Sequence, residues 1–390
     1  MKWKNKGHEN IFNEITVDKT TKFCIYGAGE LGGDLYRTLC RYDMFFGFVD
    51  NNKAIQENGY NNEIVLSEDE YFKKDIKYPI IICASIKNTP VIQENLDRRG
   101  MVYNKDYYIR EEFADVILPV ILYQLFNTTF MSLAQICVTE RCTLKCKKCA
   151  HGCYNVPITK EDMSIEKVKK SADIFFSKVD YIHEFVLIGG EPLLYKDLTE
   201  AVEYIGSKYR NQMNLFSITT NGTIIPSQEL INKCKQYNVL IRISNYSGTI
   251  KKLEPQYAKL QRFLASNNVE FRLGKKENEW MDYGFDYYQR KCTDEELIDV
   301  FDMCKTPCHE IRENKFYYCV MARSVSDNLK YNIGEDDYLD FNKLTGDNGK
   351  RELVEFIIGY SEKGYLDMCR YCHGSECHRY PIPAAEQMEK

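Results

Sequence analysis

Three cysteines in the middle of the chain carry the clearest chemical signal in this sequence. Cys142, Cys146 and Cys149 form a C-x3-C-x2-C run within the segment CTLKCKKC. A structural zinc ion takes four protein ligands in a closed tetrahedron, and a [4Fe–4S] cluster is normally held by four cysteines. Three thiolates at this spacing therefore predict a metal site with one ligand missing. In a cluster held by three cysteines, one iron is open to bind a second molecule.

Three polar segments follow apolar stretches further along the chain. The segment GGEP (189–192) comes after the stretch FVLI, and TTNGT (219–223) and ISNY (243–246) end the next two apolar stretches. Two glycines let the backbone approach a ligand closely, and a carboxylate beside them can accept an ammonium group. Serine and asparagine side chains offer donors and acceptors for a ribose or a carboxylate. The segments therefore predict a site for a polar ligand.

The cysteine run and the GGEP segment 40 residues after it together resemble the signature of the radical S-adenosylmethionine (SAM) enzymes. The resemblance covers residues 132–275, and FRLGK (271–275) falls where the family's adenine-contacting strand would lie. It implies that the open iron chelates the amino and carboxylate groups of SAM. One electron from the cluster then breaks the bond between the sulfonium and C5′. The resulting 5′-deoxyadenosyl radical takes a hydrogen atom from the substrate.

The same resemblance assigns roles to individual residues. It implies a cluster on Cys142, Cys146 and Cys149, and SAM contacts from Gly189, Gly190, Glu191, Pro192, Thr220, Asn221, Ser244 and Asn245. One departure is Lys148, because the family often carries an aromatic residue before the third cysteine, near the adenine. Taken alone, the cysteines could form a zinc site or plain loops, and the other segments could be ordinary turns. His151 and Cys153 could donate a proton or hydrogen atom to a product radical, or be a loop side chain and a buried thiol.

The N-terminal region carries a second, weaker motif. Gly27, Gly29 and Gly32 form a G-x-G-x-x-G run between a predicted strand and a predicted helix, and Asp50 ends the next predicted strand. This is the dinucleotide-binding geometry, with phosphate at the helix N-terminus and the acid on a ribose hydroxyl. The region also resembles the N-terminal domain of sugar O- and N-acyltransferases of bacterial surface glycan pathways, which implies a nucleotide or nucleotide-sugar ligand. A domain that only packs or dimerises, and hydride chemistry with NAD, are the alternatives.

The C-terminal region is rich in cysteines, at positions 292, 304, 308, 319, 369, 372 and 377. Their order resembles the twitch and SPASM extensions of radical SAM enzymes, which hold auxiliary [4Fe–4S] clusters. A glycine usually lies five residues before the second cysteine of that pattern; here it is Asn314, which tolerates a left-handed backbone. The resemblance implies one auxiliary cluster on Cys308, Cys319, Cys369 and Cys372. A second cluster using the spare Cys304, Cys377 and Cys292, a zinc site, or no metal remain alternatives.

The pattern of apolar stretches predicts an α/β fold. Residues 1–112 read as a Rossmann-like parallel sheet, and 113–131 as a connector helix. Residues 132–290 read as the radical SAM core, a partial (β/α)6 barrel with helices near 165–178, 197–210, 227–237 and 250–266. Each motif of this core ends a predicted strand, where parallel α/β barrels place their chemistry. Residues 291–390 read as the cysteine-rich twitch- or SPASM-like extension.

Composition narrows the cellular setting. The chain has 390 residues, 16 cysteines and a net charge of −5, which argues against a nucleic-acid or anionic-membrane surface. Clustered cysteines in a long chain favour metal binding over disulfides. The N-terminus MKWKNKGHENIF shows no apolar signal-peptide core, and the longest apolar run (116–126) is too short to span a bilayer. We therefore expect a cytoplasmic protein with no nucleic-acid or membrane partner.

The sequence predicts a radical SAM enzyme of oxidoreductase type. The expected substrate is a sugar or nucleotide sugar, and the expected outcome is oxidation of a C–OH carbon or epimerisation in glycan biosynthesis, with flavodoxin or ferredoxin as electron donor. A fully ligated auxiliary cluster favours net oxidation, because it can accept the electron left on a substrate radical. Maturation of a ribosomally made peptide and a non-catalytic Fe–S redox or regulatory role are the alternatives. The catalytic base is not assigned to any residue.

Overall fold

The computed structural model of the chain describes residues 2–3, 11–75, 77–285, 290–304, 308–361 and 363–389. Contacts divide the chain into two compact units, which are described separately. The smaller unit is Phe12–Thr128, and the larger unit is Met1–Ile11 together with Thr129–Lys390. The predicted connector, 113–131, falls mostly within the smaller unit. The predicted core and cysteine-rich extension share the larger unit.

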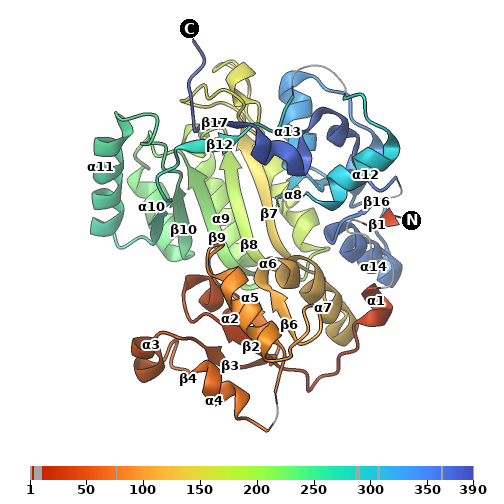
Figure 1. Cartoon of the computed structure of the whole chain (residues 1–390). Helices are drawn as coiled ribbons and strands as arrows, with labels where there is room; N and C mark the ends of the chain where they lie inside the picture. Colours follow the sequence, from red (N-terminus) through yellow and green to blue (C-terminus); the bar gives the residue numbers. More distant parts are fainter. Residues whose placement is uncertain are drawn as a thin grey trace. The chain divides into compact units, whose positions relative to one another are not determined.

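The smaller unit is built on a parallel sheet of five strands in the order β4–β3–β2–β5–β6 (Figure 1). The strands are β2 (Phe23–Tyr26), β3 (Phe45–Val49), β4 (Val65–Leu66), β5 (Ile80–Ile82) and β6 (Tyr107–Ile109). Counted along the chain this order is 3-2-1-4-5, that of a doubly wound α/β sheet. Its apolar core includes Tyr26, Val49, Ile80, Ile82 and Leu96. The continuous apolar strand predicted at 79–85 is β5, buried as parallel strands are.

Helices alternate with these strands. They are α1 (Ile11–Glu14), α2 (Glu30–Arg41), α3 (Lys53–Asn58), α4 (Glu68–Phe72), α5 (Thr89–Arg98), α6 (Arg110–Glu112), a π-helical turn (Phe113–Ile117) and α7 (Leu118–Phe126). Ser67 and Glu70 form a reciprocal capping box at the start of α4, which satisfies two free N–H groups there. Asn127 ends α7 in a left-handed conformation.

The larger unit is built on a sheet of eight strands in the order β11–β10–β9–β8–β7–β13–β14–β15. The first five of these strands along the chain are all parallel: β7 (Phe130–Thr139), β8 (Tyr181–Gly189), β9 (Met213–Thr220), β10 (Val239–Ile243) and β11 (Phe271–Leu273). In Figure 1, β10, β9, β8 and β7 stand side by side in this order. The predicted α/β class with parallel sheets is confirmed.

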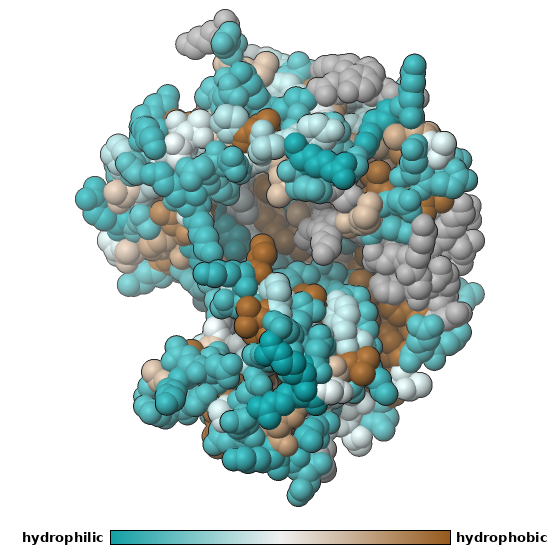
Figure 2. Space-filling model, viewed as in Figure 1, coloured by the Kyte–Doolittle hydropathy of each residue, from teal (hydrophilic) through white to brown (hydrophobic). Residues whose placement is uncertain are grey.

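Helices connect these strands close to the predicted positions. They are α8 (Ile165–Phe176), α9 (Leu198–Tyr209), α10 (Gln228–Gln236) and α11 (Leu253–Ser266). Ser164 and Ser227 cap α8 and α10 by accepting from a backbone N–H three residues on. The outer face over α11 is largely hydrophilic (Figure 2), as expected of a helix that buries only one side.

The C-terminal region continues the same sheet. Strand β13 (His309–Arg312) pairs in parallel with β7, and β14 (Lys315–Tyr317) and β15 (Tyr338–Asp340) follow in antiparallel order. The helices of this region are α12 (Asp294–Asp302), α13 (Val320–Leu329) and α14 (Gly346–Ile357), with 3-10 turns at Glu335–Asp337, Asp367–Tyr371 and Gly374–Arg379. Earlier in the larger unit, further 3-10 turns lie at Cys153–Asn155, Pro192–Leu194 and Arg210–Gln212. The short strands β1 (Lys2–Trp3) and β16 (Tyr360–Ser361) pair, as do β12 (Glu279–Met281) and β17 (Pro381–Pro383) (Figure 1).

The turn between β13 and β14 differs from its predicted form in one detail. The left-handed residue is Glu313, with φ of 56°, rather than Asn314. The Asn314 side chain instead donates to Asp340 Oδ1 over 2.6 Å, which ties the turn to β15.

Within the described part of the chain, no helix is both long and apolar enough to cross a membrane.

Candidate functional site

The polar segments predicted from the sequence meet at one edge of the larger sheet. Strands β7, β8, β9 and β10 are parallel neighbours, so their carboxyl ends lie together. The Cys142–Cys149 loop follows β7, GGEP follows β8, TTNGT follows β9 and ISNY follows β10. This is the edge at which parallel α/β folds bind their ligands.

The two glycines of GGEP let the β8 end pass close to the backbone after β7. A Cβ on Gly189 would lie 2.3 Å from the Thr139 carbonyl oxygen, and one on Gly190 would lie 2.4 Å from that of Arg141. Gly190 N donates to Thr139 O over 2.8 Å, and Glu191 N donates to Arg141 O over 2.8 Å. The close approach of the two backbones therefore requires glycine at both positions, whether or not a ligand also binds there.

Glu191 joins the GGEP and TTNGT segments. Its side chain is 0% exposed and accepts hydrogen bonds from Thr220 Oγ1 (2.7 Å), Asn221 N (2.8 Å) and Leu193 N (3.1 Å). Burial raises the pKa of this carboxyl to about 7, against the lowering effect of the three donors. These three hydrogen bonds let Glu191 position the loop around Asn221. The predicted contact of its carboxylate with an ammonium group stays a prediction.

Two sulfur atoms of the cysteine triad, those of Cys142 and Cys146, accept hydrogen bonds from the surrounding segments. Asn221 Nδ2 lies 3.6 Å from Cys142 Sγ, and Leu144 N donates to the same sulfur over 3.4 Å. Gln387 Nε2 lies 3.2 Å from Cys146 Sγ. Donors directed at sulfur favour the thiolate form, which is the form that binds iron.

The three thiols are mostly enclosed, and each lies close enough to influence the charge of the others. Burial raises the pKa of Cys142 to about 11 and that of Cys146 to about 12, and the neighbouring thiols add to both shifts. Buried thiolates need a cation to balance their charge, so this donor set fits an iron cluster. Among the described residues, no three Cys, His, Asp or Glu side chains converge as ligands of a single metal ion.

The residues next to the triad face the C-terminal region. Lys148 has a left-handed backbone, with φ of 54°, and its Nζ lies 3.1 Å from Asp282 Oδ2. Lys148, which stands where the family often has an aromatic residue, thus forms an ion pair with Asp282. Asn328 Nδ2 donates to His151 O over 2.7 Å, and the Cys153 thiol is buried. Burial lowers the pKa of His151.

The ISNY segment is joined to the residues that follow β11. Asn245 Nδ2 donates to Gly274 O over 3.2 Å, and Glu277 N donates to Asn245 O over 3.0 Å. Ser244 N donates to Thr220 O over 2.9 Å, which continues the ladder from β9 to β10. The structure therefore brings ISNY, TTNGT and FRLGK together. Their predicted contacts with SAM stay predictions.

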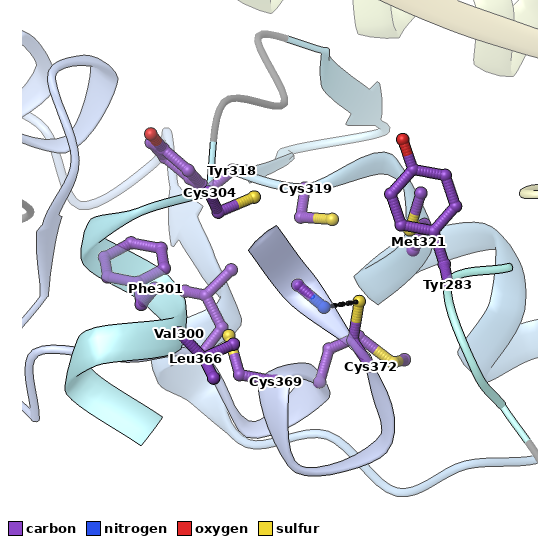
Figure 3. A pocket seen from close by; sticks show the side chains of 12 residues that line it. Tyr283, Val300, Phe301, Cys304, Tyr318, Cys319, Met321, Leu366, Cys369 and Cys372 are labelled. Carbon is purple, nitrogen blue, oxygen red and sulfur yellow. Dashed lines mark hydrogen bonds between the residues drawn. The ribbon is translucent and has the colours of Figure 1, made fainter. Parts of the chain in front are cut away.

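A second group of cysteines surrounds a pocket in the C-terminal region (Figure 3). Its empty space of about 470 Å³ is partly open to solvent and is lined by Cys304, Cys319, Cys369 and Cys372, together with aromatic and aliphatic side chains. The set differs from the predicted one in a single member. Cys304, from the end of α12, lines the pocket, and Cys308 does not. Cys308 packs against the apolar cluster around α13, as Cys319 and Cys372 also do, and residues 305–307, between Cys304 and Cys308, lie outside the described residues.

Polar contacts position the C-x2-C turn of this pocket. The buried Asp337 accepts from Asp367 N over 2.5 Å and Met368 N over 2.9 Å, which holds the start of the turn that carries Cys369. Gly374 N donates to Cys372 Sγ over 3.2 Å. Burial raises the pKa of Cys319 to about 12 and raises that of Cys369 further. This pocket, too, offers enclosed thiols to a cationic iron cluster.

In the smaller unit, the glycine motif forms a tight loop after β2. Gly27 has φ of +117°, and a Cβ there would lie 2.3 Å from Cys83 O, beyond β5. A Cβ on Gly29 would meet nothing within 4 Å. Asp50 accepts from Ala28 N through Oδ2 and from Asn52 N through Oδ1, both over 2.8 Å. Oδ2 thus holds the glycine loop, whereas Oδ1 holds the start of α3, and the predicted ribose contact stays a prediction.

Solved structures to which this chain is similar at low identity include three with S-adenosylmethionine (AdoMet) bound. Native anSMEcpe with bound AdoMet and Cp18Cys peptide is 14% identical with a TM-score of 0.39, over 63% of this chain and 88% of that one. BtrN in complex with AdoMet and 2-DOIA is 15% identical with a TM-score of 0.37, over 67% of this chain and 98% of that one. Streptococcus suis SuiB bound to S-adenosylmethionine is 17% identical with a TM-score of 0.31, over 56% and 48%.

Curated relatives match parts of the chain. A probable GTP 3′,8-cyclase of Methanococcus aeolicus is 32% identical over 150 residues, which are 37% of this chain and 44% of the relative. A GTP 3′,8-cyclase of Rhizobium etli is 27% identical over 89 residues, which are 23% of this chain and 25% of the relative. The chain thus spans between a quarter and under half the length of these relatives.

A match to a protein family covers the segments that form the site described above. Residues 136–271 match the radical SAM superfamily. The match begins within β7, before the cysteine triad, and includes the ends of β8, β9 and β10. The part of the chain that carries the candidate site is thus similar to the radical SAM superfamily.

Proposed function

We propose that the chain is a radical SAM enzyme that takes a hydrogen atom from a sugar or nucleotide sugar, with oxidation of a C–OH carbon as the main outcome and epimerisation as the second. One observation carries the radical SAM part. A loop with three cysteines follows β7, and the GGEP, TTNGT and ISNY segments end the three neighbouring strands. A structural zinc site needs only its four ligands and does not require polar segments at the ends of three neighbouring strands.

Cys142, Cys146 and Cys149 would hold the cluster, and the ends of β8, β9 and β10 would hold SAM. When bound, the cluster supplies the electron that cleaves SAM and so provides the 5′-deoxyadenosyl radical that takes hydrogen from the substrate. The chain's own residues orient these groups. Glu191 fixes the Asn221 loop through three hydrogen bonds, and Asn221 in turn reaches the Cys142 sulfur.

An auxiliary cluster is part of this proposal, with one ligand changed from the sequence prediction. Cys304, Cys319, Cys369 and Cys372 line a common pocket, so we assign the cluster to these four and not to Cys308. Four cysteines complete the usual ligand set of a [4Fe–4S] cluster. Such a cluster can take up an electron from a substrate radical but has no open iron, which supports net oxidation.

The substrate class rests on the smaller unit. Its strand order of 3-2-1-4-5 places the glycine loop after β2 and the β5 end on either side of the point where the order reverses, the usual place for a nucleotide in such sheets. The names of the curated relatives describe GTP, also a nucleotide, as the substrate of those proteins. We therefore favour a nucleotide-linked sugar.

The test is anaerobic turnover of the reconstituted protein with SAM and dithionite, followed by mass spectrometry of 5′-deoxyadenosine. A panel of nucleotide sugars is compared with no substrate, and the active sugar is then labelled with deuterium. We expect one sugar to stimulate cleavage and to transfer deuterium into 5′-deoxyadenosine, and the Cys146→Ala variant to give none. Slow cleavage that no sugar stimulates would shift the proposal to a peptide substrate. No cleavage with clusters intact would exclude the enzyme.

A further inference from the structure

The C-terminal tail lies directly against the loop of the cysteine triad. Gln387 and Cys146 form an antiparallel β-bridge although 241 positions separate them. Lys147 N donates to Glu386 O over 2.6 Å, and Met388 N donates to Lys145 O over 2.7 Å. The tail thus adds a short strand to the very segment that would hold the cluster.

The tail is fixed on its other side as well. Strand β17 pairs with β12, and Ala384 N donates to Asn278 O over 3.0 Å. Ala385 is fully buried and has a left-handed backbone, with φ of 54°, which turns the chain between β17 and Gln387. A non-glycine residue adopts this conformation only where surrounding contacts hold it. The position of Gln387 is therefore set by the fold.

The hydrogen bonds around Gln387 determine which end of its amide faces the sulfur. Lys145 N donates to Gln387 Oε1 over 2.8 Å, so Nε2 is the atom directed at Cys146 Sγ, 3.2 Å away, and at Ala385 O, 2.7 Å away. Turning the amide over would bring an oxygen against the Ala385 carbonyl and an NH2 group against the Lys145 N–H. The network thus selects the orientation in which the side chain donates to the thiolate.

We propose that Gln387 is a positioning residue of the SAM-cleaving cluster: its amide N–H to Cys146 Sγ raises the reduction potential of that cluster and ties its loop to the C-terminal tail. The proposal rests on the proposed function. Hydrogen bonds to cluster sulfurs are one of the factors that set the potential of an Fe–S cluster. Reduction adds negative charge to the cluster, and a donor near a sulfur ligand stabilises that charge. Removing the donor therefore makes the cluster harder to reduce.

The test is a redox titration of the reconstituted full-length protein, followed by electron paramagnetic resonance. The signal that changes when SAM is added belongs to the cluster with the open iron, which separates it from an auxiliary cluster. Gln387→Leu removes the donor. Gln387→Glu keeps an oxygen for Lys145 N but places a second oxygen toward the sulfur. Glu386→Gln, the matched control, weakens the neighbouring ion pair with Lys147, 2.6 Å long, without touching the sulfur.

We expect the midpoint potential to fall in the order wild type, Gln387→Leu, Gln387→Glu, with Glu386→Gln at the wild-type value and iron content unchanged. A Gln387→Leu midpoint equal to that of wild type, or an equal shift in Glu386→Gln, would overturn the proposal. If both Gln387 variants lose the signal that responds to SAM while Glu386→Gln keeps it, Gln387 has a structural role, and the proposed effect on the reduction potential is rejected. If the wild type itself shows no signal that responds to SAM, the proposed function fails, and this inference with it.

Discussion

Arg323 of α13 forms an ion pair with Glu310 of β13, and both side chains are shielded from solvent, with exposed fractions of 1% and 0%. The same guanidinium pairs with the buried Glu140, which follows β7, and Lys160 reaches Glu140 as well. Arg323 and Lys160 therefore balance the buried charges of Glu140 and Glu310 between the strands of the larger sheet and α13. Cys319, which lines the pocket of the C-terminal region, directly precedes α13. The network therefore connects this pocket to β7, the strand that leads to the cysteine triad.

Replacing Arg323 by Met should destabilise the larger unit by about 3–5 kcal/mol, because Glu310 would remain buried without its cation and Glu140 would keep only Lys160. Chemical denaturation followed by circular dichroism measures this change. The control is Lys276→Met, which removes an exposed ion pair with Glu254, 3.1 Å long, and should cost about 0.5 kcal/mol or less. An equal effect of the two variants would show that the buried network adds nothing to stability.

Replacing Cys304 by Ser should remove the auxiliary cluster and lower the iron content from about eight to about four atoms per chain. The matched variant Cys308→Ser should keep the full content, because Cys308 does not line the pocket. Iron and sulfide analysis after anaerobic reconstitution measures both. Retention of iron in Cys304→Ser together with loss in Cys308→Ser would restore the ligand set predicted from the sequence.

The glycine loop of the smaller unit offers a paired test of fold against binding. Gly27→Ala should destabilise this unit by roughly 1–3 kcal/mol, because its φ is +117° and a Cβ would lie 2.3 Å from Cys83 O. Gly29→Ala should leave the unit folded, since a Cβ there meets nothing within 4 Å. Limited proteolysis with mass spectrometry reports the stability of residues 12–128. Calorimetry with a nucleotide sugar then shows whether Gly29→Ala weakens binding, and equal protease sensitivity of the two variants would refute the difference.

Asp337 should make the stability of the metal-free protein depend on pH. Burial raises the pKa of its carboxyl from 3.8 to about 7, so the folded state keeps this proton where the unfolded state has lost it. The free energy of unfolding should therefore fall as pH rises from about 4 to about 7, by up to roughly 4 kcal/mol in total. Asp337→Asn removes the titrating group, so its denaturation midpoint should vary less with pH over that window. The same slope in both proteins would contradict the assignment.

Much of the fold could be predicted because its signals are local. Apolar stretches of strand length alternate with helical patterns from β7 to β11, and the predicted helices near 165–178, 197–210, 227–237 and 250–266 correspond to α8 to α11. The Cys142–Cys149 loop and GGEP could be placed at one edge of the sheet for the same reason. In a parallel sheet the carboxyl ends of neighbouring strands must meet.

The lining of the C-terminal pocket shows what spacing cannot give. The C-x2-C turn of Cys369 and Cys372 is a local spacing, whereas the place of Cys304 on the pocket wall depends on the packing of Val300 and Phe301 from α12, and the ligand set itself stays a prediction. Likewise, Asn314 was the expected left-handed residue, but Asp340 from β15 engages its side chain and Glu313 takes that conformation.

The order of the elements and the short spacing of Cys142, Cys146 and Cys149 could be read from neighbouring residues, since strand periodicity and ligand spacing are local properties. Contacts between distant side chains could be learned only from the folded chain. Gln387 reaches Cys146 from 241 positions away, and Arg323 reaches Glu140 from 183 positions away. No local pattern encodes such pairs, because they form only when the closing of the sheet and the path of the tail bring them together.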